Sequence, residues 1–243
     1  GCIYFAPFDA GKVLCVNPEA QTAEMFGPEL DGITKFAAGG VLASNGCIYF
    51  APCDAGQVLC VNPEAQTAEM IGPELDGWNM FLAGGVLAPN GCIYFAPCDA
   101  GQVLCVNPEA QTAEMTGPEL DGDFKFLAGG VLAPNGCIYF APYNAGQVLC
   151  VNPEAQTAEM IGPELVGQSK FIAGGVLAPN GCIYFAPAAA RQVLCVNPEA
   201  RTAETIGPEL DGDEKFAAGG VLAPNGCIYF APYEAGQVLS VRT

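Results

Sequence analysis

Histidine is absent from this 243-residue sequence, and basic residues are scarce, with 8 Lys and Arg against 26 Asp and Glu. Without imidazole, the chain lacks the commonest general base and the commonest metal ligand. The formal net charge of −18 opposes binding to phosphate backbones and to anionic membranes. We therefore expect no nucleic-acid partner, no membrane partner, no metal and no cofactor.

Long uninterrupted segments are also missing. Hydrophobic residues make up 51% of the chain, but 31 Gly and 20 Pro interrupt them every few positions. No apolar stretch of about 20 residues remains to span a bilayer, and no window keeps a helical period. The sequence predicts an all-β protein.

An internal repeat of 45 residues dominates what is present. The heptapeptide GCIYFAP begins at Gly1 and returns at each later repeat, so the chain holds five full copies and a partial sixth, residues 226–243. The second repeat contains four segments with strand character, at residues 84–88, 47–51, 57–61 and 67–71. Four short strands per repeat of this length are typical of a β-propeller blade.

The one long link in each repeat joins residues 67–71 to residues 84–88. In a propeller this link connects the outermost strand D of one blade to the innermost strand A of the next, so residues 47–51 form strand B and residues 57–61 form strand C. This assignment gives six B and C strands but five A and D strands. We expect a single domain over residues 1–243 with six blade positions, and five blades as the alternative.

Two segments resemble YVTN-type and gluconolactonase-like propeller repeats. QVLCVNPEAQTAEMIGPEL resembles the family's V-x-V-I-D-P-x-T segment through Val61, Asn62, Pro63 and Thr67, and VLAPNGCIYFAP resembles its P-D-G-x-x-Y-V hairpin. The resemblance implies the fold. It implies little about function, because these motifs form turns and the superfamily includes binding modules, scaffolds, hydrolases and dehydrogenases.

Thirteen cysteines are present, without Cys-x-x-Cys spacing. A B–C hairpin centred near the tenth residue of the repeat places Cys47 and Cys60 on opposite faces of the blade, where they cannot form a disulfide. We expect the thiols to be reduced and to fill space in the core. An odd number of buried thiols favours a reducing compartment and a cytoplasmic location.

Differences among the repeats are concentrated in the B–C and D–A links. Alternate links of a meander emerge on one side, so this variation predicts a one-sided recognition surface built from aromatic and charged residues. The candidate ligand-binding residues are Phe8, Asp9, Ile33, Lys35, Trp78, Asn79, Met80, Asp123, Phe124, Tyr143, Asn144, Gln168, Tyr233 and Glu234.

These features predict a non-enzymatic scaffold that binds a protein segment or a glycan, in an oligomeric state that the sequence leaves open. No catalytic residue is assigned, because a thiol or hydroxyl nucleophile would need a Lys base in the absence of His. The alternatives are a metal-dependent hydrolase or lyase of the gluconolactonase-like kind, and a designed or recently amplified repeat without a selected ligand.

Overall fold

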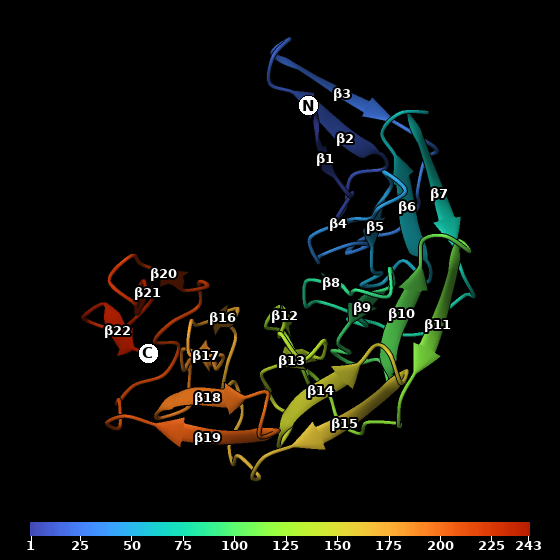
Figure 1. Cartoon of the computed structure of the whole chain (residues 1–243). Helices are drawn as coiled ribbons and strands as arrows, with labels where there is room; N and C mark the ends of the chain where they lie inside the picture. The colour runs from blue at the N-terminus through green and yellow to red at the C-terminus, as the bar shows by residue number, and fades with distance from the viewer. The chain divides into compact units, whose positions relative to one another are not determined.

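The structure, a computed structural model, describes residues 1–243 and consists of 22 β-strands joined by turns (Figure 1). No helix in it has the length and apolar character required to cross a membrane. Contacts divide the chain into two compact units, Gly1–Met115 and Thr116–Thr243. Whether the two units behave as one domain stays a prediction.

The second sheet shows how strands from two consecutive repeats are combined. Its strands are β4 (Val41–Leu42), β5 (Ile48–Phe50), β6 (Val58–Asn62) and β7 (Thr67–Ile71), in the order β4-β5-β6-β7 with antiparallel pairing. These are strands A to D, as predicted. Strand A is shorter than expected, with two residues in place of five.

The other five sheets repeat this arrangement, and three of them are complete. The third sheet contains β8 (Val86–Leu87), β9 (Ile93–Phe95), β10 (Val103–Asn107) and β11 (Thr112–Thr116). The fourth sheet contains β12 (Val131–Leu132), β13 (Ile138–Phe140), β14 (Val148–Asn152) and β15 (Thr157–Ile161). The fifth sheet contains β16 (Val176–Leu177), β17 (Ile183–Phe185), β18 (Val193–Asn197) and β19 (Thr202–Ile206).

The first and last sheets have three strands each. The first contains β1 (Ile3–Phe5), β2 (Val13–Asn17) and β3 (Thr22–Phe26), and lacks strand A. The last contains β20 (Val221–Leu222), β21 (Cys227–Phe230) and β22 (Leu239–Arg242), and lacks strand D. Six sheets, with the incomplete ones at the two ends, confirm the predicted six blade positions.

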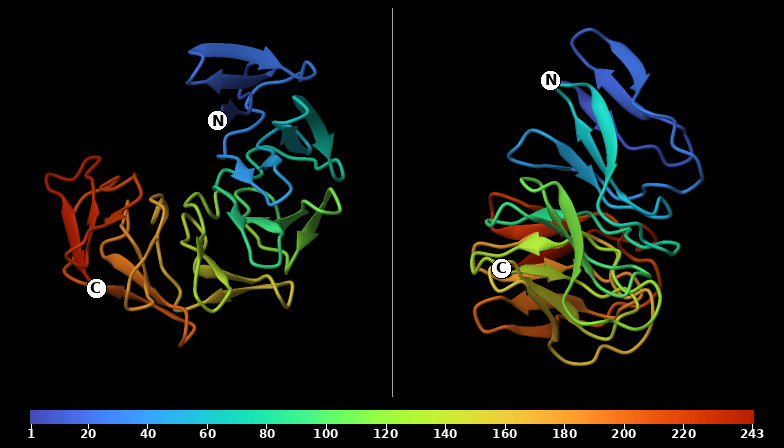
Figure 2. Two further views of the ribbon diagram at one scale, coloured as in Figure 1. Left: turned by 45° about the horizontal axis from the view of Figure 1, so that its top comes forward. Right: turned by 90° about the vertical axis from the view of Figure 1, so that its right-hand side faces the viewer.

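Successive sheets within each unit pack against one another (Figure 2). In the first unit, Tyr49 and Val58 on one face of the second sheet meet Phe95 and Val106 on the third. In the second unit, the fifth sheet packs on the sixth through Ile228 and Phe230. The second and fifth sheets, which lie in the middle of their units, are therefore apolar on both faces.

Strand A approaches strand B closely because its second glycine has no side chain. A Cβ atom added to Gly85 would overlap the ring of Phe95, which is fully buried, whereas a Cβ atom at Gly84 would meet nothing within 4 Å. We expect Gly85→Ala to lower the free energy of unfolding by about 1–3 kcal/mol through overpacking. Gly84→Ala, its matched control, should change it little. Chemical denaturation of both variants tests this, and equal effects would contradict it.

The cysteine placement predicted above is wrong. Cys60 pairs with Tyr49 across strands B and C. Since Cys47 lies two residues before Tyr49, all three side chains occupy the same face of the sheet. The B–C hairpin is centred half a residue earlier than expected, so each residue of strand B pairs with a residue of strand C one position away from the predicted partner. This shift moves Cys60 to the face that carries Cys47. No disulfide joins any of the thirteen cysteines in the structure, and their redox state in solution stays a prediction.

Alkaline pH is expected to destabilise the fold. Burial raises the pKa of Cys60 to about 11 and the pKa values of Cys53 and Tyr49 to about 12. The folded chain therefore keeps protons that the unfolded chain releases from about pH 9 upward. The free energy of unfolding keeps its full value below that pH and decreases above it, by about 1.4 kcal/mol per pH unit for each retained proton. Urea unfolding from pH 8 to pH 11 measures the effect, and a flat profile would contradict it.

Candidate functional site

The B–C and D–A loops of neighbouring sheets are joined by backbone hydrogen bonds. In the second unit, the Tyr143 amide donates to the Lys125 carbonyl (2.8 Å) and the Lys170 amide donates to the Tyr143 carbonyl (3.0 Å). The same alternation continues through Ala188 and Lys215 to Tyr233. The two loop classes therefore lie on one side of the sheets, as predicted. We call this side the loop face.

The A–B and C–D turns meet on the opposite side. The Asn45 side-chain amide of an A–B turn donates to the Pro108 carbonyl of the next sheet's C–D turn (2.9 Å). Asn135 and Pro198 repeat this contact in the second unit, also at 2.9 Å. We call this side the turn face. Its turns are almost identical between repeats, whereas the loop face carries most of the variation.

Each D–A loop holds a variable triplet whose three residues have different placements. The first residue is exposed, as at Trp78, which is 71% exposed. The second adopts a left-handed backbone conformation, as at Ser169 (φ 53°). The third points inward, as at Lys35 and Met80, which are 2% and 3% exposed.

Lys35 and Met80 therefore do not contribute side chains to the loop face, which corrects the sequence prediction for both residues. The ammonium of Lys35 turns back under its own loop and donates to the Gly32 carbonyl (2.5 Å). The sequence predicted both residues from a variable column, and a Lys side chain is seldom found in a protein interior. The backbone of the loop, not the side-chain type, decides the direction.

Two polar residues of the predicted site, Asp9 and Asn144, connect neighbouring loops by hydrogen bonds. The Asp9 carboxylate accepts a hydrogen bond from the Thr34 amide (2.8 Å), and the Asn144 side chain accepts one from the Ser169 amide (3.0 Å). Each bond joins a B–C loop to the D–A loop beside it. These side chains therefore help to hold the second triplet residue in its left-handed conformation.

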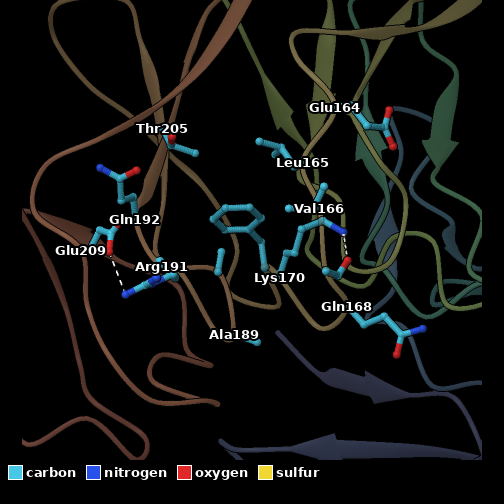
Figure 3. A pocket seen from close by; sticks show the side chains of 13 residues that line it. Glu164, Leu165, Val166, Gln168, Lys170, Ala189, Arg191, Gln192, Thr205 and Glu209 are labelled. Carbon is cyan, nitrogen blue, oxygen red and sulfur yellow. Dashed lines mark hydrogen bonds and ion pairs between the residues drawn. The ribbon is translucent and has the colours of Figure 1, made fainter.

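The buried Lys170 lies against a cavity of about 310 Å³ in the second unit (Figure 3). Its ammonium donates to the carbonyls of Gly167 (2.6 Å) and Asn144 (3.3 Å). Burial lowers the pKa of Lys170, while the Glu164 carboxylate acts in the opposite direction. On the far side of the cavity, Arg191 forms an exposed ion pair with Glu209 (2.7 Å).

Lys170→Met is expected to maintain or raise the free energy of unfolding at pH 7. The second repeat already has Met80 at this position, and replacing a buried charge with an apolar side chain of similar size is often neutral or stabilising. Because folding lowers the pKa of Lys170, any advantage of the variant should shrink as the pH approaches 10.5. Denaturation at pH 7 and pH 10 measures this, and a loss above about 2 kcal/mol would contradict it.

A second cavity, of about 380 Å³, opens on the loop face of the second unit. Two tyrosines from B–C loops, Tyr143 and Tyr233, line it together with Ser169 and Glu214 from D–A loops. Ala188 stands between the two tyrosines along the hydrogen-bonded loops and leaves this space open. The Ser169 hydroxyl and the Tyr143 hydroxyl are hydrogen-bonded at 3.0 Å. We call this cavity the tyrosine pocket.

The structure brings two of the predicted residues together in this pocket and leaves the others elsewhere on the loops. Tyr233 is 66% exposed and Tyr143 is half-buried. The remaining predicted residues that are exposed or half-buried are Phe8, Asp9, Ile33, Trp78, Asn79, Asp123, Phe124, Asn144, Gln168 and Glu234.

The sequence prediction missed five residues that line the pocket. Ser169 and Glu214 lie in the variable triplet but were not selected. Ala188 occupies the same variable column as the two tyrosines, and its small size is the informative feature. Ile172 and Ala217 line the apolar part of the pocket, at a position that also differs among the repeats.

Repeated four-stranded antiparallel sheets of this kind define a β-propeller-like fold, and solved structures support this class. Virginiamycin B lyase from Staphylococcus aureus, crystallised with quinupristin in a catalytically inactive form, matches all of this chain and 78% of its own, with 11% identity and a TM-score of 0.71. A streptogramin B lyase matches all of this chain and 80% of its own, with 13% identity and a TM-score of 0.67.

A nutrient-binding protein with the same fold is more distant. The auxiliary nutrient binding protein from Bacteroides thetaiotaomicron matches 94% of this chain and 63% of its own, with 14% identity and a TM-score of 0.53. At these identities the likeness shows the fold alone. No protein family and no curated protein matches the sequence.

Proposed function

We propose that this chain is a non-enzymatic binding scaffold of the YVTN-like propeller type, and that the tyrosine pocket is its principal ligand site. The observation that carries the proposal is the convergence of Tyr143, Tyr233, Ser169 and Glu214 from four loops onto one cavity. Its volume and its mixture of aromatic, small apolar and a few polar groups match those of small-ligand sites.

The lining defines the ligand by its chemistry. The two phenol rings offer flat apolar surface, and Ser169 and Glu214 offer hydrogen-bonding groups at the rim. Glu214 and the net charge of −18 repel anions. We infer that the ligand is an uncharged or cationic group with an apolar face, presented by a glycan or by a protein segment.

The lining also supports a role without catalysis. Glu214 is its only carboxylate, and the pocket offers neither a second carboxylate for glycosidic chemistry nor a thiol or amine nucleophile. The lyases that share the fold do so at 11–13% identity, and their chemistry does not transfer to this chain on fold likeness.

A binding screen with two arms tests the proposal. One arm presents neutral and acidic glycans, and the other presents neutral and basic peptides, each to the intact chain at moderate salt. We expect saturable binding in one arm, competition for a single site and no chemical change in the recovered ligand. A modified ligand would identify an enzyme, and a complete lack of binders in both arms would overturn the proposal.

A further inference from the structure

Each full repeat places two thiols on one face of its sheet. In the second repeat, Cys60 pairs with Tyr49 across strands B and C, and Cys47 precedes Tyr49 by two residues on the same strand. Cys47 and Cys60 are therefore diagonal neighbours on the same face. Both thiols are buried and line the same cavity.

Four other repeats contain the same pair. Of the thirteen cysteines, Cys53 and Cys98 lie in B–C loops, and Cys227 has Ser240 at the position of the second thiol. Ten cysteines remain, and the strand register makes them five pairs of diagonal neighbours, each pair on one face of its sheet: Cys2 with Cys15, Cys47 with Cys60, Cys92 with Cys105, Cys137 with Cys150, and Cys182 with Cys195.

The pair in the second repeat lines a small polar cavity. Cys47 and Cys60 share a space of about 250 Å³ with Asn62, Glu69 and Gln111. Gln111 belongs to the C–D turn of the third repeat, so this cavity lies toward the turn face. The thiol pairs are therefore distinct from the tyrosine pocket, and their chemistry does not depend on the function proposed above.

We propose that the five thiol pairs are binding sites for a soft monovalent d¹⁰ cation, with Cu(I) as the natural candidate. Soft thiolate ligands favour Cu(I), zinc and iron–sulfur clusters, and of these Cu(I) is the one that two thiolates in a linear arrangement satisfy. No group of three or more Cys, Asp or Glu side chains is arranged to hold a metal, whereas structural zinc is usually bound by four ligands. Each binding event converts two thiols and one Cu(I) into a bis-thiolate complex and releases two protons.

An anaerobic titration measures the stoichiometry. The fully reduced chain is mixed with Cu(I) held by a coloured chelator, and the loss of colour reports transfer to the protein. We expect five Cu(I) ions per chain and protection of ten thiols from a thiol reagent, corresponding to the five pairs. Transfer of less than one ion per chain would overturn the proposal.

Three single substitutions make the assignment specific. Cys60→Ser should reduce the stoichiometry from five to four, and the fold already accepts Ser at the equivalent position 240. Ser240→Cys, which restores the second thiol beside Cys227, should raise it to six. Cys53→Ser removes an unrelated buried thiol and should leave it at five. A Cu(I) stoichiometry that changes with the total number of thiols, or that stays at five in Ser240→Cys, would overturn the assignment of one ion to each pair.

Discussion

A chain that ends at Asn225 is expected to lose cooperative unfolding of its second unit and to self-associate. Residues 226–243 form β21 and β22 of the last sheet. Ile228, Phe230 and Val241 on these strands pack with Tyr184 and Val193 of the fifth sheet in one buried cluster. Without them, the apolar face of the fifth sheet is open to water, and repeat arrays need an end that covers this surface.

Light scattering and urea unfolding of the truncated chain test this expectation. A matched pair of point variants in the full-length chain then shows how much of the effect comes from the loss of side-chain packing alone. Phe230→Ala removes a fully buried ring and should cost about 3–5 kcal/mol. Tyr229→Ala, on the opposite face of the same strand and 37% exposed, should cost much less. A truncated chain that stays monomeric and unfolds cooperatively would show that the last two strands are dispensable.

Loss of the two pocket tyrosines is expected to lower the affinity for the ligand strongly. Replacing Tyr143 and Tyr233 with Ala removes both rings from the tyrosine pocket. A well-buried aromatic anchor contributes on the order of 2 kcal/mol to binding, so each single variant should weaken the ligand roughly tenfold or more. Titration calorimetry with the best ligand from the screen gives the ratio.

Variants on the turn face are the controls for this experiment. Pro179 and Glu199 are exposed residues of an A–B and a C–D turn in the same unit. Pro179→Ala and Glu199→Ala should leave the affinity nearly unchanged. Trp78→Ala tests the first unit separately, because Trp78 is exposed but does not line the pocket. If the turn-face variants weakened binding and loss of both tyrosines did not, the ligand site would lie on the turn face and the proposal would be contradicted.

The strand order and the side occupied by each loop were predictable from the sequence, because both follow from the repeat and its turns. A period of 45 residues with three short links and one long link permits few arrangements. The strand count also predicted the two three-stranded sheets, one without strand A and one without strand D.

Side-chain direction was less predictable. The alternation of faces in a strand makes pairing sensitive to a single residue, and the B–C link offered no turn motif that fixed its centre. The actual pairing of Tyr49 with Cys60 therefore exchanged the predicted faces. The burial of Lys35 and Met80 follows from the backbone conformation of the D–A loop, which residue type alone does not reveal. The cavity beside Ala188 was not predicted, because candidate residues were selected for aromatic or charged side chains and not for small ones.

Fluorine NMR of 3-fluorotyrosine-labelled protein measures most directly whether the ligand binds at the tyrosine pocket. The chain has 8 tyrosines, and Tyr→Phe variants assign the resonances. Tyr143 and Tyr233 report on the pocket, whereas the Tyr49 and Tyr139 hydroxyls donate to turn-face carbonyls of Pro108 (3.4 Å) and Pro198 (3.5 Å). Ligand should shift the Tyr143 and Tyr233 signals and leave the Tyr49 and Tyr139 signals in place. Shifts confined to Tyr49 and Tyr139 would contradict binding at the loop face.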